Sequence, residues 1–311
     1  YGARTYCFTL ALYVGGGAVI RTQLKLFPEE TKKGQVTKTT RIRQSSSLSL
    51  KDADPLVGHI GKNFSTSDRR YYAGMIDGDG CISLRVTKKN TPVFMVALNL
   101  RYDHAEPILK LAEMFDLTIS KRSYLIPRGK AQPQLKTVLA GIKGKLFLFS
   151  IYPYLLEKKE KARDALISVG CPEDYLPKDR QFSFEYLAGY TDAEGRIRFG
   201  LQHHKARAGY SPCSSYKMYY ELISNDNNHL QFIKQNLIDR GFDHFRKDYI
   251  DTYRSLSKEE RLKRHPTTHI VLGGKPAQLS KFYKNIEPFI LIKHKKDNML
   301  ATMKYNDIIN L

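Results

Sequence analysis

The chain has 311 residues, with 51 lysines and arginines against 31 aspartates and glutamates, so its formal net charge is +20. This excess favours a polyanionic partner over a basic surface that is merely solvated. The four cysteines lie far apart without a Cys-x-x-Cys pair, which argues against a zinc ribbon or a disulfide framework and favours a reducing compartment. The longest apolar run, Tyr6–Ile20, is too short to span a membrane, so we expect no membrane association.

Residues 1–62 precede the part of the chain that carries an internal repeat. The polar, basic stretch Glu29–Ser49 is typical of a linker. The segment lacks the acid-poor, amphipathic character of a transit peptide. Because the first residue is not Met, we expect this start to be processed or to follow an upstream segment.

A short motif occurs twice, each time in an expected helix that leads into an expected strand. The first copy is Tyr71–Gly80, followed by Cys81–Thr87, in which apolar and polar residues alternate as in a half-buried strand. The second copy is Phe184–Gly195, followed by Arg196–Gln202. Equivalent positions in the two motifs are about 115 residues apart throughout, which indicates an internal duplication.

The two copies continue with the same order of expected elements: helix, strand, strand, helix, strand, strand, helix, helix. The helix expected at Asn228–Arg240 corresponds to Pro107–Phe115, and Leu279–Phe289 corresponds to a helix from Leu146. This order predicts an α+β chain of two similar domains. We expect an N-terminal extension or linker at 1–62, the first domain at 63–170, a connector at 171–183 and the second domain at 184–311.

Each motif places an acidic residue, Asp79 or Glu194, at the end of its helix, where the macrodipole disfavours a carboxylate. If the two helices pack against each other, these carboxylates meet and must share a proton or a cation. Oxygen ligands without a nearby Cys or His favour Mg²⁺. Asp77 and Asp192 are expected to support these ligands. The small residues that would allow a close helix crossing at the domain interface are Ala73, Gly74, Ala188 and Gly189.

The strands after the motifs present polar side chains on one face, opposite the apolar face that would join the core. Arg, Gln, Ser and Thr on a sheet suit base edges and phosphates, although a solvated sheet face is the competing interpretation for any single residue. The candidate nucleic-acid-contacting residues are Ser83, Arg85, Thr87, Arg196, Arg198 and Gln202.

Two lysines stand at equivalent positions after a Pro-containing segment in each repeat. Lys158 follows Pro153 by five residues, and Lys293 follows Pro288 by five residues. A lysine beside a metal site can stabilise negative charge on an attacked phosphate. Most lysines in so basic a chain lie on the surface, but the repeat symmetry makes this pair a catalytic candidate.

The two motifs resemble those of the LAGLIDADG homing endonucleases, over roughly residues 63–311. The motifs stand here as Tyr72–Gly80 and Leu187–Gly195, with Tyr72 in place of the usual leucine and Thr191 in place of an apolar residue. Two motifs in one chain are similar to the monomeric class of this family. The resemblance implies two pseudo-symmetric αββαββα domains that pack through their motif helices and form a saddle of curved antiparallel sheets over double-stranded DNA.

The resemblance also implies an activity and roles for the matched residues. The chain would be an intron-encoded, site-specific DNA endonuclease that hydrolyses one phosphodiester on each strand and leaves staggered ends. Asp79 and Glu194 would bind the catalytic divalent metal, and Lys158 and Lys293 would match the basic residue before the last helix. The outward residues of the two strands would read DNA.

Two other functions stay open at this point. The first alternative is a maturase that binds its intron RNA and assists splicing, since a basic surface also suits RNA phosphates. The second is a structural protein of an organellar assembly.

The stretch Ala18–Leu24 resembles the end of the first helix of cytochrome oxidase subunit one, which would fit an intron reading frame continuous with its exon. We therefore expect an organellar protein and favour the mitochondrion over the chloroplast.

Overall fold

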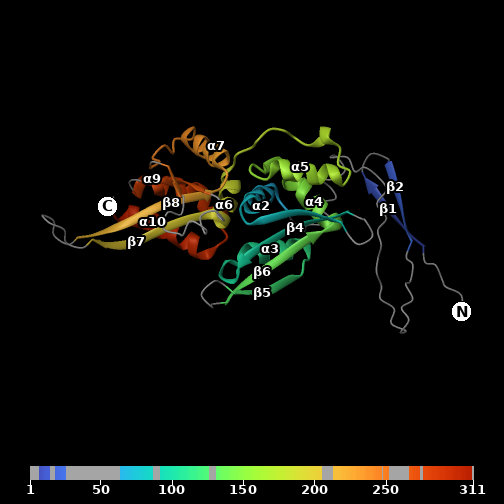
Figure 1. Cartoon of the computed structure of the whole chain (residues 1–311), viewed down its shortest axis with the longest axis horizontal. Coiled ribbons are helices and arrows are strands. Elements are labelled where there is room, and N and C mark those ends of the chain that lie inside the picture. The colour runs from blue at the N-terminus through green and yellow to red at the C-terminus, as the bar shows by residue number, and fades with distance from the viewer. Residues whose placement is uncertain are drawn as a thin grey trace. The chain divides into compact units, whose positions relative to one another are not determined.

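The computed structural model describes residues 7–14, 18–25, 64–86, 92–125, 131–204, 213–246, 248–251, 266–273 and 276–309 (Figure 1). The chain divides into two compact units, Tyr1–Ser47 and Leu48–Leu311. The smaller unit contains an antiparallel pair of strands, β1 (Cys7–Val14) and β2 (Ala18–Lys25). The stretch Ala18–Leu24, whose sequence resembles the end of a helix of cytochrome oxidase subunit one, is therefore part of a strand in this structure. No helix among the described residues is long and apolar enough to cross a membrane.

The larger unit begins with a half that carries the first motif. Its elements, in chain order, are α2 (Thr66–Gly78), β3 (Gly80–Val86), β4 (Pro92–Arg101), α3 (Glu106–Phe115), β5 (Ile119–Leu125), β6 (Ala131–Ala140), α4 (Gly141–Ile151) and α5 (Lys159–Ser168). Short 3₁₀ turns precede α3 and α5, and a third lies in the connector at Glu173–Tyr175. Ser65 begins α2 with a capping box, because its hydroxyl accepts from the Asp68 backbone while the Asp68 carboxylate accepts from the Ser65 backbone.

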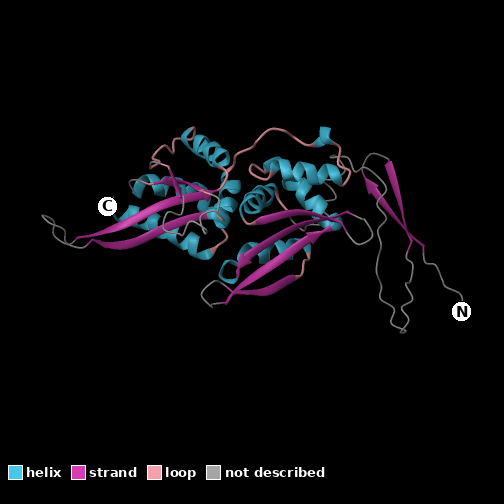
Figure 2. Ribbon diagram, viewed as in Figure 1, coloured by secondary structure: helices cyan, strands magenta, loops and turns pink. Residues whose placement is uncertain are grey.

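The other half repeats this order from the second motif. Its elements are α6 (Phe184–Glu194), β7 (Gly195–His204), β8 (Cys213–Ser224), α7 (Asn227–Ile238), β9 (Tyr249–Asp251), β10 (Thr267–Leu272), α9 (Pro276–Ile286) and α10 (Lys293–Ile309). Helices and strands are segregated as in an α+β protein (Figure 2). The predicted fold class and element order are therefore confirmed.

The two four-stranded sheets have the same topology. Their strand orders are β3-β4-β6-β5 and β7-β8-β10-β9, with antiparallel neighbours throughout. In each sheet, one face carries the buried apolar residues, such as Val96 and Leu139 in the first and Leu222 and Ile270 in the second. The helices pack on this face. The other face, which we call the open face, carries the alternate residues of the same strands.

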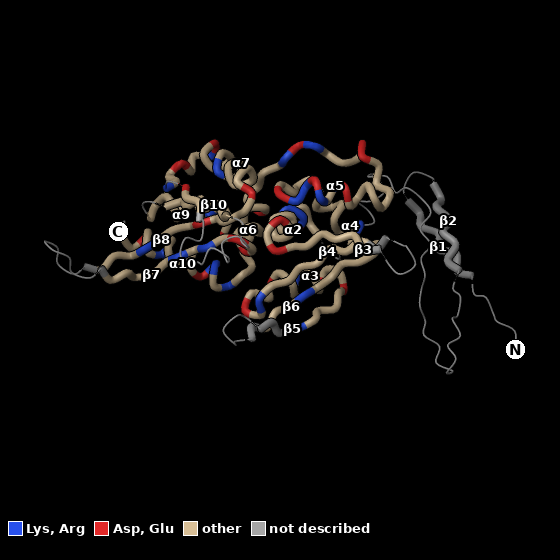
Figure 3. Tube along the Cα trace, viewed as in Figure 1, with Lys and Arg blue, Asp and Glu red and all other residues tan. Residues whose placement is uncertain are grey.

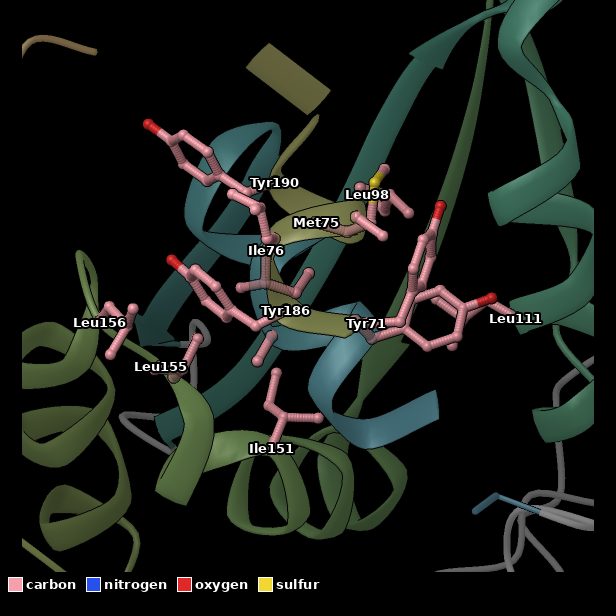
Figure 4. Packing of buried hydrophobic residues seen from close by; sticks show 14 of the residues in the cluster. Tyr71, Met75, Ile76, Leu98, Leu111, Ile151, Leu155, Leu156, Tyr186 and Tyr190 are labelled. Atoms are coloured by element: carbon pink, nitrogen blue, oxygen red, sulfur yellow. The ribbon is translucent and has the colours of Figure 1, made fainter. Parts of the chain in front are cut away.

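The core continues from one half to the other through the two motif helices. Figure 4 shows Tyr71, Met75 and Ile76 of α2 beside Tyr186 and Tyr190 of α6, with apolar side chains of the first half around them, and the same hydrophobic cluster continues into the second half. All five of these side chains are buried. The two halves therefore share one hydrophobic core at the place where α2 and α6 meet.

Candidate active site

The crossing of α2 and α6 is built on glycine. A Cβ on Gly74 would overlap the carbonyl oxygen of Tyr186 and would lie 2.6 Å from the backbone nitrogen of Tyr190. A Cβ on Gly189 would overlap the carbonyl oxygen of Tyr71 in the same way. No side chain fits at either glycine without a shift of the partner backbone. Of the small residues selected in the sequence, Gly74 and Gly189 therefore lie at this crossing, and Ala73 and Ala188 beside them are fully buried.

Each helix also holds a buried aspartate that accepts a hydrogen bond from a tyrosine of the opposite helix. The hydroxyl of Tyr186 donates to Asp77 Oδ2 at 2.7 Å, and the hydroxyl of Tyr71 donates to Asp192 Oδ2 at 2.7 Å. The two bonds are related by the repeat, since each residue of one pair lies 115 positions from its counterpart in the other. They join the two halves of the chain in a symmetric way.

The same aspartates accept backbone hydrogen bonds from the segment that follows the 3₁₀ turn in their own half. Burial raises the pKa of both Asp77 and Asp192, and these hydrogen bonds oppose that effect. The two carboxylates therefore have a structural role, because they tie the last turns of α2 and α6 to these backbone segments. The backbone donors are Leu156, Glu157 and Lys158 for Asp77, and Leu291 and Ile292 for Asp192.

Asp79 and Glu194 lie at the adjoining ends of the two motif helices. Asp79 is the C-cap of α2, and Glu194 is the last residue of α6. Gly78, which precedes Asp79, packs against the end of α6, because a Cβ on it would overlap Cβ of Ala193 and would lie 3.1 Å from Cγ of Glu194. Desolvation and the nearby charge of Glu194 raise the pKa of Asp79 to about 7. Burial, followed by the charge of Glu157, raises the pKa of Glu194. Neighbouring carboxyl groups whose pKa values are both raised favour a bound cation.

The donor set at this point fits a hard cation. Among the described residues, no group of three or more His, Cys, Asp or Glu side chains could hold a metal ion. A cation between Asp79 and Glu194 would therefore complete its coordination with backbone carbonyls, water or substrate oxygens. Mg²⁺ accepts such a site, since it is commonly held by one or two carboxylates together with substrate phosphate and water.

A lysine holds the end of each motif helix, and it is half-buried in the first half (Lys158) and buried in the second (Lys295). Lys158 Nζ donates to the carbonyl oxygens of Ile76 at 2.8 Å, Gly78 at 2.9 Å and Gly80 at 2.8 Å. In the other half, Lys295 Nζ donates to the carbonyl oxygens of two residues at the end of α6, Thr191 and Asp192. Burial lowers the pKa of both lysines, and the neighbouring carboxylates oppose this. Each ammonium thus neutralises the negative end of a helix dipole next to the candidate metal ligands.

In the second repeat, the lysine that contacts the end of the motif helix is Lys295, and the structure places the sequence candidate Lys293 away from it. Lys293 Nζ contacts Asp297 Oδ2 at 2.7 Å, one turn along the same helix, and its side chain is 78% exposed. The reason is the start of the last helix. Lys158 precedes α5, whereas Lys293 is already the first residue of α10, and the side chain that reaches back to α6 is Lys295. Only the helix register distinguishes these two lysines.

Replacing Lys295 with Met should destabilise the chain, because two buried carbonyls would lose a charged donor. We expect the free energy of unfolding to fall by about 2–3 kcal/mol, the cost of a lost hydrogen bond to a charged group. Urea denaturation followed by circular dichroism measures this. Lys293→Met is the matched control and should leave the urea midpoint unchanged. Equal losses in the two variants would contradict the assignment of Lys295.

The raised pKa of Asp79 predicts a pH-dependent stability in the absence of divalent cations. The pKa of Asp79 is higher in the folded chain than its ordinary value of 3.8. Protonated Asp79 therefore stabilises the fold fully below pH 3.8, and this contribution is lost as the pH rises through about 7. Asp79→Asn removes this loss, so the variant should melt above the wild type at pH 8, and the difference should shrink toward pH 4. Melting curves in a chelator check this, with the exposed Asp174→Asn as control. A difference that is the same at every pH would contradict it. Neighbouring groups desolvate the Asp79 carboxyl, but the residue as a whole is exposed, so screening by solvent keeps the difference small.

One polar network breaks the symmetry of the site. His229, which is buried, lies with Nε2 2.9 Å from the hydroxyl of Tyr186 and with Nδ1 3.0 Å from Oε2 of Glu157. Burial alone would raise the pKa of Glu157, but the hydrogen bond and charge of His229 outweigh it and lower the pKa. The second repeat has the apolar Ile292 at the position equivalent to Glu157. The two halves of the site are therefore chemically different.

The open faces of the sheets carry four of the six polar residues that the sequence pointed to. In the second sheet, Arg196, Arg198 and Gln202 are exposed along β7. In the first sheet, Ser83 is half-buried on β3, Arg85 is placed in β3 by its backbone pairing with Val93, and Thr87 lies outside the described residues. Figure 3 shows Lys and Arg along β6, β7 and β8.

The neighbouring strands add residues to these faces that the sequence analysis missed. On the first sheet, Asn99 Nδ2 donates to Gln134 Oε1 at 2.8 Å, and Lys136 pairs with Asn99 in the strand register. On the second sheet, Lys217 and Tyr219 of β8 lie opposite Gly200 and Arg198. The alternation of polar and apolar residues in β4, β6 and β8 could have indicated that these strands also have a polar face. Which of these residues lie beside one another depends on the strand register, which the alternation does not give.

Two departures from the family motif are accommodated inside the core. The Tyr72 hydroxyl donates to the carbonyl oxygen of Pro107 at 2.9 Å. Thr191 Oγ1 donates to the carbonyl oxygen of Leu187 at 2.6 Å and lies 2.7 Å from the Tyr220 hydroxyl. Both buried hydroxyl groups therefore have hydrogen-bond partners, and neither departure disturbs the acidic residues.

Comparison with known proteins gives similarity in structure at low sequence identity. No protein-family model and no curated protein matches the chain. One similar solved structure is the LAGLIDADG meganuclease I-AabMI bound to uncleaved DNA, at 14% identity and a TM-score of 0.49, covering 78% of this chain and 91% of that one. A second is the I-LtrWI LAGLIDADG homing endonuclease bound to target DNA, at 13% identity and a TM-score of 0.47, covering 79% and 93%. A third is the I-SmaMI LAGLIDADG homing endonuclease bound to cleaved DNA, at 13% identity and a TM-score of 0.45, covering 78% and 89%. All three are LAGLIDADG nucleases, the family that the two sequence motifs resemble.

Proposed function

We propose that this protein is a LAGLIDADG-type homing endonuclease that cuts both strands of a specific double-stranded DNA site with the help of Mg²⁺. The observation that carries the proposal is the meeting of Asp79 and Glu194 at the ends of two helices whose glycines pack backbone to backbone. A fold gains no stability from two carboxylates placed together at the negative ends of helix dipoles. Such a placement is explained by a cation that acts on phosphate.

The residues of the chain divide the chemistry among them. Asp79 and Glu194 would hold the divalent cation, which supplies an activated water and neutralises charge on the attacked phosphodiester. Lys158 and Lys295 keep the last turns of α2 and α6 in place through the backbone carbonyls. They act as positioning residues, because their ammonium groups are already engaged with the protein.

The open faces of the two sheets would hold the DNA. Their exposed Arg, Lys and Gln side chains suit phosphates and base edges, and the net charge of +20 supports association with a polyanion. Because the two halves differ in sequence on these faces, the preferred site would be asymmetric. Because one chain supplies both acids, we propose that the enzyme acts as a monomer, with domains at 63–170 and 184–311.

The biological setting belongs to the same proposal. A homing endonuclease of this type would be encoded by an intron and would act in an organelle, with the mitochondrion favoured by the sequence of Ala18–Leu24. Association with intron RNA as a maturase is an alternative outcome of the test below.

The test is a cleavage selection. The purified full-length chain is incubated with Mg²⁺ and a library of randomised DNA duplexes together with the uninterrupted host locus, and the cut molecules are sequenced. The proposal expects one family of sites cut on both strands. Absence of any cut duplex, together with faster splicing of the precursor RNA when the chain is added, would overturn it in favour of the maturase.

A further inference from the structure

Glu221 is an acidic residue on the open face of the second sheet, next to the β7 edge that carries Arg196 and Arg198. It lies on β8 directly opposite Arg196 of β7 and Val271 of β10 in the strand register. Its neighbours on this face at the β7 edge are arginines, yet Glu221 itself is only 4% exposed. A carboxylate on a surface that receives DNA opposes phosphate binding, so its presence calls for another role.

Three side chains cover this carboxylate. Oε1 accepts a hydrogen bond from the hydroxyl of Tyr249 at 2.6 Å and lies 2.9 Å from Nδ1 of His269. Oε2 lies 3.7 Å from Nη1 of Arg196. Burial and Glu221 raise the pKa of the Tyr249 phenol, which therefore keeps its proton and donates. The acid thus accepts a hydrogen bond from Tyr249, lies within hydrogen-bond distance of His269 and forms an ion pair with Arg196, and these three residues lie on three different strands.

Tyr249 and His269 also contact each other, and His269 has a second polar partner. The rings of Tyr249 and His269 stack at 4.3 Å between centroids and 20° between planes. Nε2 of His269 lies 3.2 Å from the hydroxyl of Thr267, so both ring nitrogens have partners. We call Glu221, His269, Tyr249 and Arg196 the Glu221 cluster. Its inner members are fixed by one another before any ligand arrives.

Only two members of the Glu221 cluster face solvent to a large extent. The side chain of Arg196 is 66% exposed, and Tyr249 is 46% exposed. An arginine that is free to move contacts phosphates of any sequence, whereas a guanidinium held on one side presents its remaining donors in a fixed direction. The base edge that takes two parallel donors is that of guanine, through O6 and N7 in the major groove.

We propose that Glu221 is a positioning residue that, together with His269 and Tyr249, orients Arg196 to read a guanine close to the cleaved bonds. The inference rests on the proposed DNA endonuclease function. Arg196 follows the candidate metal ligand Glu194 by two residues, which places the base it reads near the reacting phosphate. The role of Glu221 is therefore sequence discrimination, at a cost in overall attraction to DNA.

The test compares Glu221→Gln with the wild type on a panel in which each base pair of the selected duplex is changed in turn. The wild type should reject changes at one G·C pair by about 10- to 100-fold in kcat/KM. Glu221→Gln should lower this rejection to about threefold or less and leave the other positions unchanged. Because it removes a negative charge, it should also bind non-target duplex more tightly. Arg196→Ala should lose discrimination at the same pair, and the double variant should lose no more.

Two further variants keep the test decisive. Tyr249→Phe keeps the ring and removes one donor, and it should relax discrimination at the same pair only. Asp174→Asn changes the net charge by the same amount at an exposed residue of the connector and should leave the profile unchanged. A folded Glu221→Gln that loses all sites equally, or that keeps the wild-type profile, would overturn the role of Glu221. A wild type that cuts no duplex would instead overturn the proposed function itself.

Discussion

Gly74→Val is expected to lower the free energy of unfolding by about 3 kcal/mol or more, which is the upper end of the cost of overpacking. The added atoms would meet the backbone of α6 at the Tyr186 carbonyl and the Tyr190 nitrogen, and neither can move aside as a flexible side chain could. The shift would also pull Tyr186 away from Asp77 and Tyr71 away from Asp192. Urea denaturation, monitored by far-UV circular dichroism, measures the loss.

The matched control for this change is Gly200→Val. A Cβ on Gly200 meets nothing within 4 Å, and the residue lies in β7, where a β-branched side chain is well tolerated. We expect its midpoint to stay close to that of the wild type. Equal midpoints for Gly74→Val and the wild type would show that the two helices do not cross as described.

The second large effect concerns the acids. Asp79→Asn combined with Glu194→Gln should lower the rate of DNA cleavage by roughly a thousandfold or more, because both proposed metal ligands lose their charge. Binding of the same duplex should persist, since the open faces are unchanged and the variant is more positive by two charges. Single-turnover cleavage and a binding titration in Ca²⁺ or in a chelator separate the two quantities.

An isocharge control distinguishes metal ligation from a general charge effect. Glu173→Gln combined with Asp174→Asn makes the same two chemical changes at exposed positions of the connector. This control should cut at the wild-type rate. Cleavage that survives in the Asp79 and Glu194 double variant would remove both residues from the metal site.

The two-domain architecture could be predicted because the sequence motif and the order of expected elements occur twice in the chain. The spacing from small residues to acid to strand is the same in both motifs, so an interpretation made for one copy could be checked on the other. Two acids in a dipole-disfavoured position were a stronger signal than either acid alone. The order of helices and strands followed from the period of the apolar residues.

The contacts of individual side chains in the site depended on where each helix begins and on how the helices and strands pair, and the sequence pattern does not specify either. Lys293 and Lys295 are two residues apart, and only the first residue of α10 decides which one reaches α6. The tyrosine–aspartate bonds between the halves require a close antiparallel or crossed packing of α2 and α6 that motif spacing alone leaves open. Glu221 could not be placed beside Arg196 until β7 and β8 were paired.

The most direct measurement maps the broken bonds on each strand of the selected duplex after a single turnover with Mg²⁺. The two-acid centre predicts one break per strand at a fixed stagger, both lost together in a chelator and in the double variant of Asp79 and Glu194. Breaks at scattered positions, breaks that persist without a divalent cation, or no break at all would contradict it.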